Sequence, residues 1–311
     1  MKKIAISGVT GFLGSRIATH FQQSGWTIVH LLRTDFSESG VAQLAGRLEG
    51  CSVVLHLAGA PINRRWSNAY MNRLRVSRIT TTRILVQALE RVSVKPQLFL
   101  CASAVGIYPL QGNCCSEGNC CTEGDFPLSA GPEERLANDD PTAFLQQLCR
   151  NWEYEASCCP ASIRLVTLRL GVVLGAGGGA FESMRPPLRL GVAAQLGASG
   201  EPFSWIHIDD LLAAIAWIVA YDQIRGPVNL VAPEQGTQGE FARALASAFG
   251  SFGVVKVPSF ALRILYGRAV SVLTRGRRVC PAVLTDSGFR FACPDTMSVA
   301  RLLADEVKQV L

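Results

Sequence analysis

The sequence predicts an α/β protein, built on a doubly wound, Rossmann-type parallel sheet with a smaller, mainly helical C-terminal domain. Two observations carry this prediction. Apolar runs of strand length alternate with helical stretches, a pattern typical of a parallel sheet covered on both faces. The first run also leads into a glycine-rich turn that opens a helix. The predicted strands are Lys3–Ser7, Thr27–Leu32, Ser52–Leu57, Gln97–Ala102, Arg164–Leu170 and Pro227–Val231.

The turn after the first strand has the spacing of a dinucleotide-binding loop. Its glycines allow a tight turn and a close approach of the backbone to a pyrophosphate, and a helix N-terminus offers free N–H groups to the phosphates. An amphipathic helix is expected over Phe12–Ser24, and the next strand begins at Thr27. This context favours a dinucleotide site over a glycine-rich turn without a ligand. The candidate cofactor-binding residues are Gly8, Thr10, Gly11, Phe12, Leu13 and Gly14.

The end of the second strand bears on the choice of cofactor. Arg33 is the first polar side chain after this strand, and its planar fork suits the 2′-phosphate of NADP. The alternative is that Asp35 binds the ribose hydroxyl of NAD, and we favour NADP. After the third strand, the small residues Ala58, Gly59 and Ala60 let the backbone lie close to the cofactor.

Length and composition set the class of protein. The chain has 311 residues, 49% of them hydrophobic and 17% charged, which is a globular composition. We predict a nucleotide-binding domain over residues 1–233, with a substrate-side insertion near 175–204, and a helical domain over 234–311. The net charge of +6 is spread along the chain, so neither nucleic acid nor a membrane is an expected partner. The oligomeric state is left open.

The predicted location is the cytoplasm. The longest apolar helix, over 211–221, is far shorter than the roughly 20 residues that a membrane span needs. Glycines at 8, 11 and 14 interrupt any signal-peptide core.

Eleven cysteines are many for such a protein, and four lie close together at 114, 115, 120 and 121. Their spacing matches no standard zinc site, so a metal is the less favoured reading. We expect a solvated, redox-prone loop without a structural disulfide.

With these features, the chain resembles the extended short-chain dehydrogenases/reductases. It is most similar to an atypical, epimerase-like subgroup with a C-terminal domain of unknown function. That subgroup is described as NAD(P)-dependent nucleotide-sugar epimerases and sometimes as cell-division inhibitors. The motifs that carry the resemblance, beside the glycine turn, are Leu57-Ala58-Gly59, Arg64-Arg65-Trp66, Ser77-Arg78, residues 103–108, 149–153, 170–175, 204–210, 226–229 and 278–281.

The chain departs from the parent family at its catalytic pair. That family uses a tyrosine with a lysine four residues later, and none of the five tyrosines here has such a lysine. The aligned positions hold Cys149 and Glu153, and Ser103 lies one residue before the usual serine position, which is Ala104. The resemblance makes Cys149, Glu153 and Ser103 the candidate catalytic residues.

The pair Cys149 and Glu153 is four residues apart, so both side chains can face the nicotinamide ribose. Glu153 would accept hydrogen bonds from ribose hydroxyls, and its charge would raise the pKa of Cys149. The alternative is that Cys149 only packs under the nicotinamide ring while Glu153 anchors the ribose.

Candidate substrate residues lie on loops expected to face the cofactor. Arg64 could clamp a carboxylate or phosphate, with Trp66 beside it, and His207 is an alternative acid/base group, although a structural histidine is commoner. The predicted function is therefore an NADP-dependent oxidoreductase or epimerase-like enzyme on a small substrate, with an anionic group as one option. The rival is a non-catalytic NADP(H)-binding sensor or regulatory protein.

Overall fold

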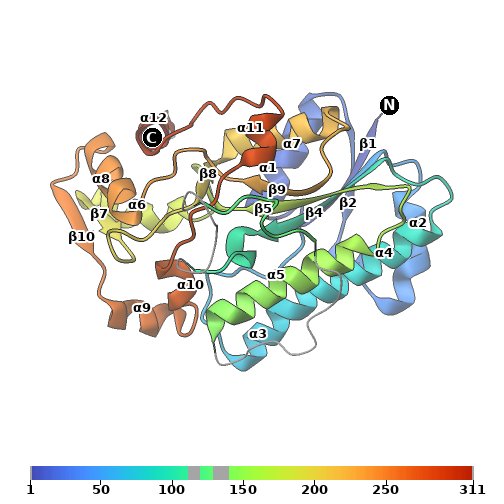
Figure 1. Ribbon diagram of the computed structural model, residues 1–311, viewed down its shortest axis with the longest axis horizontal. Helices are drawn as coiled ribbons and strands as arrows, with labels where there is room; N and C mark the ends of the chain where they lie inside the picture. Colours follow the sequence, from blue (N-terminus) through green and yellow to red (C-terminus); the bar gives the residue numbers. More distant parts are fainter. Residues whose placement is uncertain (1, 111–119, 129–139, 310–311) are drawn as a thin grey trace.

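The computed structural model describes residues 2–110, 120–128 and 140–309, and it contains a central six-stranded sheet (Figure 1). All strand pairs in this sheet are parallel. The six predicted strands are all present, with small shifts at their ends. They are β1 (Lys3–Ser7), β2 (Thr27–Leu31), β3 (Val53–His56), β4 (Leu98–Ala104), β5 (Arg164–Leu170) and β9 (Gly226–Leu230).

The strand order is β2-β1-β3-β4-β5-β9, so the doubly wound topology is confirmed. The chain leaves β1 toward one edge of the sheet to form β2, and then returns to the other side of β1 to form β3. Ligands of open α/β sheets bind beyond the carboxyl ends of the strands at such a reversal. The topology therefore directs attention to the loops that follow β1 and β3.

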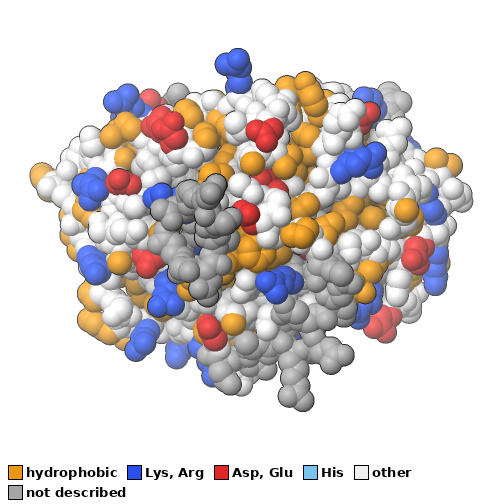
Figure 2. Space-filling model, in the orientation of Figure 1, with side chains coloured by type: hydrophobic (Ala, Val, Ile, Leu, Met, Phe, Trp, Pro, Cys, Tyr) orange, Lys and Arg blue, Asp and Glu red, His pale blue; other side chains and the backbone are white. Residues whose placement is uncertain are grey.

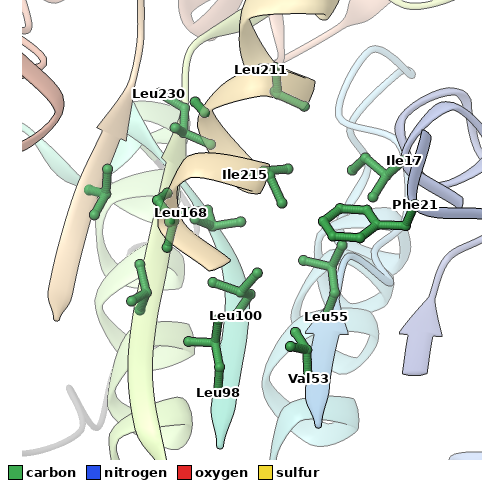
Figure 3. Packing of buried hydrophobic residues seen from close by; sticks show 14 of the residues in the cluster. Ile17, Phe21, Val53, Leu55, Leu98, Leu100, Leu168, Leu211, Ile215 and Leu230 are labelled. Atoms are coloured by element: carbon green, nitrogen blue, oxygen red, sulfur yellow. The ribbon is translucent and has the colours of Figure 1, made fainter. Parts of the chain in front are cut away.

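Helices cover both faces of the sheet. On one face, α1 (Phe12–Gln23) and α7 (Ile208–Ala220) bury Ile17, Phe21 and Ile215 against the strands (Figure 3). The opposite face is covered by α2 (Val41–Leu48), α4 (Thr81–Arg91) and α5 (Pro141–Ser157). Strands buried on both faces explain the nearly continuous apolar runs in the sequence.

The helical stretch over 68–91 is interrupted in its middle. It consists of α3 (Asn68–Arg75), a π-helical turn over Val76–Thr80, and α4. Single π-helical turns within α-helices are frequent at functional sites. Here the turn holds Ser77 and Arg78, which contact the loop after β3: the Ala60 N–H donates to Ser77 Oγ at 2.9 Å, and Arg78 donates to the Ala60 carbonyl at 3.0 Å.

The C-terminal part combines helices with short strands. β7 (Val192–Gln195) pairs in parallel with β10 (Gly253–Lys256), and β6 (Val172–Leu174) pairs with β8 (Trp205–His207). The helices of this part are α6 (Phe181–Arg189), α8 (Gln238–Ala248), α9 (Ser259–Tyr266), α10 (Val270–Thr274), α11 (Ala282–Asp286) and α12 (Thr296–Gln309). Residues from 174–205 and from 232–303 share one hydrophobic cluster. The insertion near 175–204 and the C-terminal segment thus pack together, while the boundary at 233/234 stays a prediction.

The cysteine prediction is wrong in one respect. Cys120 and Cys280 form a disulfide with a Cα–Cα distance of 5.9 Å, and Cys121 is 4% exposed. The backbone around the disulfide is also paired, since the Cys121 N–H donates to the Arg278 carbonyl and the Cys280 N–H to the Cys121 carbonyl, each at 2.9 Å. Sequence spacing could not reveal this pair, because its partner lies 160 residues away. Cys114 and Cys115 lie outside the described residues.

The described surface and helices bear on the expected partners. On the face seen in Figure 2, lysine and arginine side chains are interspersed with aspartate and glutamate. No helix among the described residues is both long and apolar enough to cross a membrane.

Candidate cofactor and active site

The glycine turn lies at the sheet's topological reversal. Gly8 has a φ of 75°, which a side chain rarely tolerates, and the Gly11 N–H donates to the Gly8 carbonyl at 3.0 Å. The helix α1 begins after Gly11 without a side-chain cap and without an acidic residue in its first turn. Thr10 and Gly11 are exposed. No side chain therefore caps the first N–H groups of α1, which follow the exposed Thr10 and Gly11, and an uncapped helix N-terminus suits a bound anion.

Two other contacts show why glycine is needed around this turn. A Cβ on Gly14 would lie 2.2 Å from the Gly8 carbonyl oxygen, so only glycine allows α1 to pack so close to β1. A Cβ on Gly8 would lie 3.1 Å from the carbonyl carbon of Leu57, in the loop after β3. The two loops at the reversal are thus in direct contact.

The glycine-rich segment 175–179 packs against the same loop. A Cβ on Gly178 would lie 2.2 Å from Phe12 Cδ2, and Arg16 donates to the Ala176 carbonyl at 2.9 Å. From the other side, the Ala176 N–H donates to Glu306 of α12 at 2.9 Å. The C-terminal helix thereby holds a segment that lies beside the glycine turn.

The end of β2 separates the two cofactor hypotheses. Asp35 is 7% exposed, and its carboxylate accepts a hydrogen bond from the Leu32 N–H at 2.7 Å and pairs with Arg47 at 3.2 Å. Arg33 is exposed and forms no ion pair within the described part of the chain. Asp35 is therefore occupied by the protein, whereas the Arg33 guanidinium is free to bind a phosphate.

A buried polar network ties the two loops together behind the glycine turn. Ser7 Oγ accepts hydrogen bonds from the N–H groups of Leu57 and Ala58, at 3.0 and 3.1 Å, and lies 2.7 Å from His56 Nδ1. The other ring nitrogen of His56 lies 3.3 Å from Thr81 Oγ1. Burial lowers the pKa of His56 to about 3, so the ring is neutral at physiological pH.

This histidine predicts a specific pH dependence of stability. Below a pH of about 6.5 the unfolded chain binds a proton at His56 that the folded protein binds only near pH 3. We expect the contribution of His56 to be complete above pH 6.5 and lost as the pH falls toward 3, by at most about 1.4 kcal/mol per pH unit. Urea unfolding between these pH values should show a shallower pH dependence for His56→Gln than for the wild type. Parallel curves for the two proteins would contradict the prediction.

Strand register creates a second polar group at the same edge of the sheet. Ser103 of β4 pairs with Arg169 of β5, and Arg169 pairs with Asn229 of β9. Arg169 is fully buried and donates to both carboxylate oxygens of Glu153, at 2.9 and 2.8 Å. Ser103 Oγ donates to Glu153 at 2.6 Å. Glu153 of α5 is thus hydrogen-bonded to side chains of both β4 and β5.

Tyr108 extends this group. Arg169 donates to the Tyr108 hydroxyl at 2.9 Å, and that hydroxyl donates to Asn229 Oδ1 at 2.7 Å. Burial raises the pKa of Tyr108 to about 12, so its hydroxyl keeps its proton at physiological pH. The group thus contains a neutral tyrosine, hydrogen-bonded to Arg169 and Asn229, and the buried ion pair of Arg169 with Glu153.

Cys149 lies one turn before Glu153 on α5 and is 1% exposed. Burial, followed by the charge of Glu153, raises the pKa of its thiol to about 12. The charges of Arg78, Arg277 and Arg169 act on the same thiol in the opposite direction. Cys149 is therefore a neutral thiol near several guanidinium groups, and its catalytic role stays a prediction.

The three candidate substrate residues lie in different surroundings. Arg64 is exposed. Trp66 is 3% exposed, and its indole donates to the Ile62 carbonyl at 2.9 Å. His207 is fully buried, and its Nδ1 accepts from the Asp209 N–H at 3.2 Å at the start of α7. These contacts favour structural roles for Trp66 and His207.

Glu306 completes the surroundings of His207. Its Oε1 lies 3.2 Å from His207 Nε2, and with Asp209 these residues form a His/Asp/Glu group whose ligand atoms lie within 4.8 Å of one another. Both ring nitrogens thus face groups of the protein, the Asp209 N–H and the Glu306 carboxylate. The cap on α7 and the adjacent Glu306 carboxylate account for the position of His207.

Arg169, Tyr108 and Arg277 are residues of this site that the sequence predictions do not include. One signal was available for Arg169, since an arginine within a buried parallel strand needs a buried carboxylate partner. The sequence does not identify that partner, because the position of Glu153 on its helix equally fits a ribose ligand. Tyr108 and Arg277 were not singled out, because their importance depends on contacts between distant segments.

A glycine-rich strand–turn–helix at the reversal of a parallel sheet, followed by a second strand that ends at a free arginine, defines a dinucleotide-binding α/β protein. Residues 4–230 match the NAD dependent epimerase/dehydratase family, and the chain belongs to that family. Residues 257–301 match a domain of unknown function, DUF1731. The resemblance seen in the sequence is therefore confirmed.

Relatives match along nearly the whole chain. Epimerase family protein SERP0438 of Staphylococcus epidermidis is 31% identical, over 94% of this chain and 95% of its own. Epimerase family protein SDR39U1 of Mus musculus is 30% identical, over 94% of this chain and 96% of its own. The crystal structure of human SDR39U1 (isoform 2) with NADPH superposes with a TM-score of 0.83 at 26% identity, covering 97% of this chain and 99% of that one.

Proposed function

We propose that this protein is an NADP(H)-dependent, epimerase-like oxidoreductase that acts on a small anionic substrate. The choice of NADP over NAD rests on the different surroundings of Arg33 and Asp35 at the end of β2. The acidic residue that would select NAD is held by Arg47, while the arginine that would select NADP has no partner among the described residues. The NADPH complex of human SDR39U1 supports the same choice.

The residues around the glycine turn fit this cofactor. The uncapped N-terminus of α1 would hold the pyrophosphate, and the loop of Ala58 and Gly59 would let the cofactor lie against the backbone. When bound, the nicotinamide supplies hydride chemistry, and the protein contributes binding and orientation. The Phe12 side chain, which lies against Gly178, would limit the access of water to one side of the bound cofactor.

Replacement of Arg33 tests the choice of cofactor. We expect Arg33→Ala to weaken NADPH binding by about 10- to 100-fold, because a charge-assisted contact to the 2′-phosphate contributes roughly 1.5–3 kcal/mol. NADH lacks this phosphate, so its affinity should be unchanged. Calorimetric titration with both cofactors measures the two constants. The matched control is Arg91→Ala, an exposed arginine at the end of α4. Equal losses for NADPH and NADH would argue against the assignment.

Proton handling in the proposed reaction falls to the groups around Cys149. The Ser103 hydroxyl donates a hydrogen bond to Glu153, and both carboxylate oxygens of Glu153 accept hydrogen bonds from Arg169. The neutral Cys149 thiol is the remaining member of the three candidates and can donate a hydrogen bond, although its high pKa makes it a weak acid. A water molecule of the bound state would then complete the proton transfer.

The rival function is a non-catalytic NADP(H)-binding sensor. The observation that favours it is the missing tyrosine–lysine pair, together with the raised pKa of Cys149. To separate the two functions, we would load the protein with NADPH deuterated at the transferred position. It would then be mixed with aldehydes, ketones and nucleotide sugars. Deuterium in any product supports the enzyme, and tight binding without transfer across the panel supports the sensor. Gly11→Leu is the control for transfer outside the site.

A further inference from the structure

Arg277 is a buried arginine that the fold holds firmly in place. Its residue is 6% exposed, and its Nε donates to the Tyr108 carbonyl. Its own carbonyl accepts from Ser204 Oγ at 2.5 Å. The next residues, 278–280, pair with Cys121 and carry the disulfide from Cys280 to Cys120. The backbone of this segment and the Nε atom of Arg277 are therefore both held in place, which fixes the position of the guanidinium.

No carboxylate among the described residues pairs with Arg277. Its Nη2 is buried and makes no hydrogen bond, and none of the ion pairs between described residues includes Arg277 or Arg78. Both guanidinium charges act on the Cys149 thiol, as does that of Arg169. Glu153, whose charge also acts on this thiol, is paired with Arg169. Of the three guanidinium groups, those of Arg277 and Arg78 therefore have no carboxylate partner among the described residues.

Such an arrangement is costly without a ligand. A buried charge needs a counter-charge to offset its desolvation, and an arginine does not shed its proton in proteins. Burial lowers the pKa of Arg277 and of Arg78, which is the sign of this cost. Uncompensated groups of this kind are found at binding sites, where a ligand supplies the missing partner.

We propose that Arg277 binds the anionic group of the substrate, a carboxylate or a phosphate, beside Cys149, with Arg78 as the second positive charge of the site. The planar fork of an arginine suits either oxyanion. The inference rests on the proposed function, because it places the substrate next to the candidate reacting groups. It also assigns the anchor to a buried residue of the C-terminal part and not to the exposed Arg64.

The test uses the full chain saturated with NADPH, so that the cofactor site cannot take up the probe. Sodium acetate and sodium phosphate are the two probes, compared with sodium chloride at equal ionic strength, and the readout is the change in Tm. Binding to the folded state raises the Tm. We expect at least one probe to raise the Tm of the wild type, and the identity of that probe separates a carboxylate site from a phosphate site.

The variants locate the site. Arg277→Gln should abolish the response to the probe, retain NADPH binding and have a Tm equal to or above that of the wild type without the probe, because an unpaired buried charge is removed. The control Arg278→Gln replaces the exposed neighbour and should respond as the wild type does. Should Arg277→Gln fail to fold, Arg277→Lys keeps the charge but loses the fork, and the dissociation constant of the probe should rise at least about fivefold.

Two results would overturn the inference. One is an Arg277→Gln protein that responds to the probe as the wild type does. The other is a wild type that binds NADPH tightly but responds to neither anion, a result that leaves the proposed cofactor function standing. Failure of the wild type to bind NADPH would overturn the proposed function itself, together with the inference that rests on it.

Discussion

Gly11→Leu should abolish NADPH binding while the protein stays folded. Gly11 has a φ of −83°, which other residues adopt, and a Cβ there would meet only the Gly8 carbonyl oxygen, at 3.3 Å. A leucine side chain would instead extend into the exposed space before the first N–H groups of α1. We expect a loss of affinity of at least about 100-fold, equivalent to roughly 2.7 kcal/mol, with a Tm close to that of the wild type. Calorimetric titration and thermal unfolding measure the two quantities.

Two other glycines provide controls. Gly46 lies in α2, where a Cβ would meet nothing within 4 Å. Gly46→Ala should therefore preserve both the affinity for NADPH and the Tm. Gly14→Ala should lower the Tm, because its Cβ would lie 2.2 Å from the Gly8 carbonyl oxygen. If Gly11→Leu binds NADPH normally, the glycine turn is not the cofactor site.

Glu153→Gln should cost the protein about 3–5 kcal/mol of stability, because it leaves Arg169 buried without a charged partner. Both oxygens of Glu153 accept hydrogen bonds from Arg169. Urea unfolding of the wild type and the variant measures this difference. A ribose ligand at the surface would give a much smaller change in stability, with the main effect on NADPH affinity.

A double-mutant cycle separates the ion pair from other effects of the substitution. Arg169→Met should also destabilise the protein, since it leaves Glu153 unpaired. The double variant Glu153→Gln/Arg169→Met should lose clearly less than the sum of the two single losses, because it leaves no buried charge. Additive losses, or a Glu153→Gln protein as stable as the wild type, would show that the pair contributes little.

The parts of the site that the sequence predicted are those encoded locally. The glycine turn, the helix after it and Arg33 at the end of β2 lie within one strand–helix–strand unit, so their spacing is visible in the sequence. The four inner strands β1, β3, β4 and β5 are visible for a similar reason, because a strand buried on both faces is a continuous apolar run.

The interpretation of single side chains depended on long-range contacts. Their place in loops predicts substrate roles for Trp66 and His207. In the structure Trp66 packs edge-on against Phe144 of α5, with 5.7 Å between the ring centroids, and His207 faces Glu306 of the last helix. Asp35 follows β2 at the place of a ribose ligand, but its carboxylate pairs with Arg47. In each case the competing partner is on another element, so no local pattern contains it.

The sequence by itself determined the doubly wound sheet, the dinucleotide turn and the family, because periodicity and glycine spacing are properties of neighbouring residues. The tertiary structure decided the electrostatics around Cys149. Strand register places Ser103, Arg169 and Asn229 side by side. The helix α5 brings Glu153 to them, and its carboxylate pairs with Arg169. Arg277 reaches the same place through a segment more than a hundred residues further on. Which charges are paired and which are free depends on distances between remote residues, and only the folded chain defines those distances.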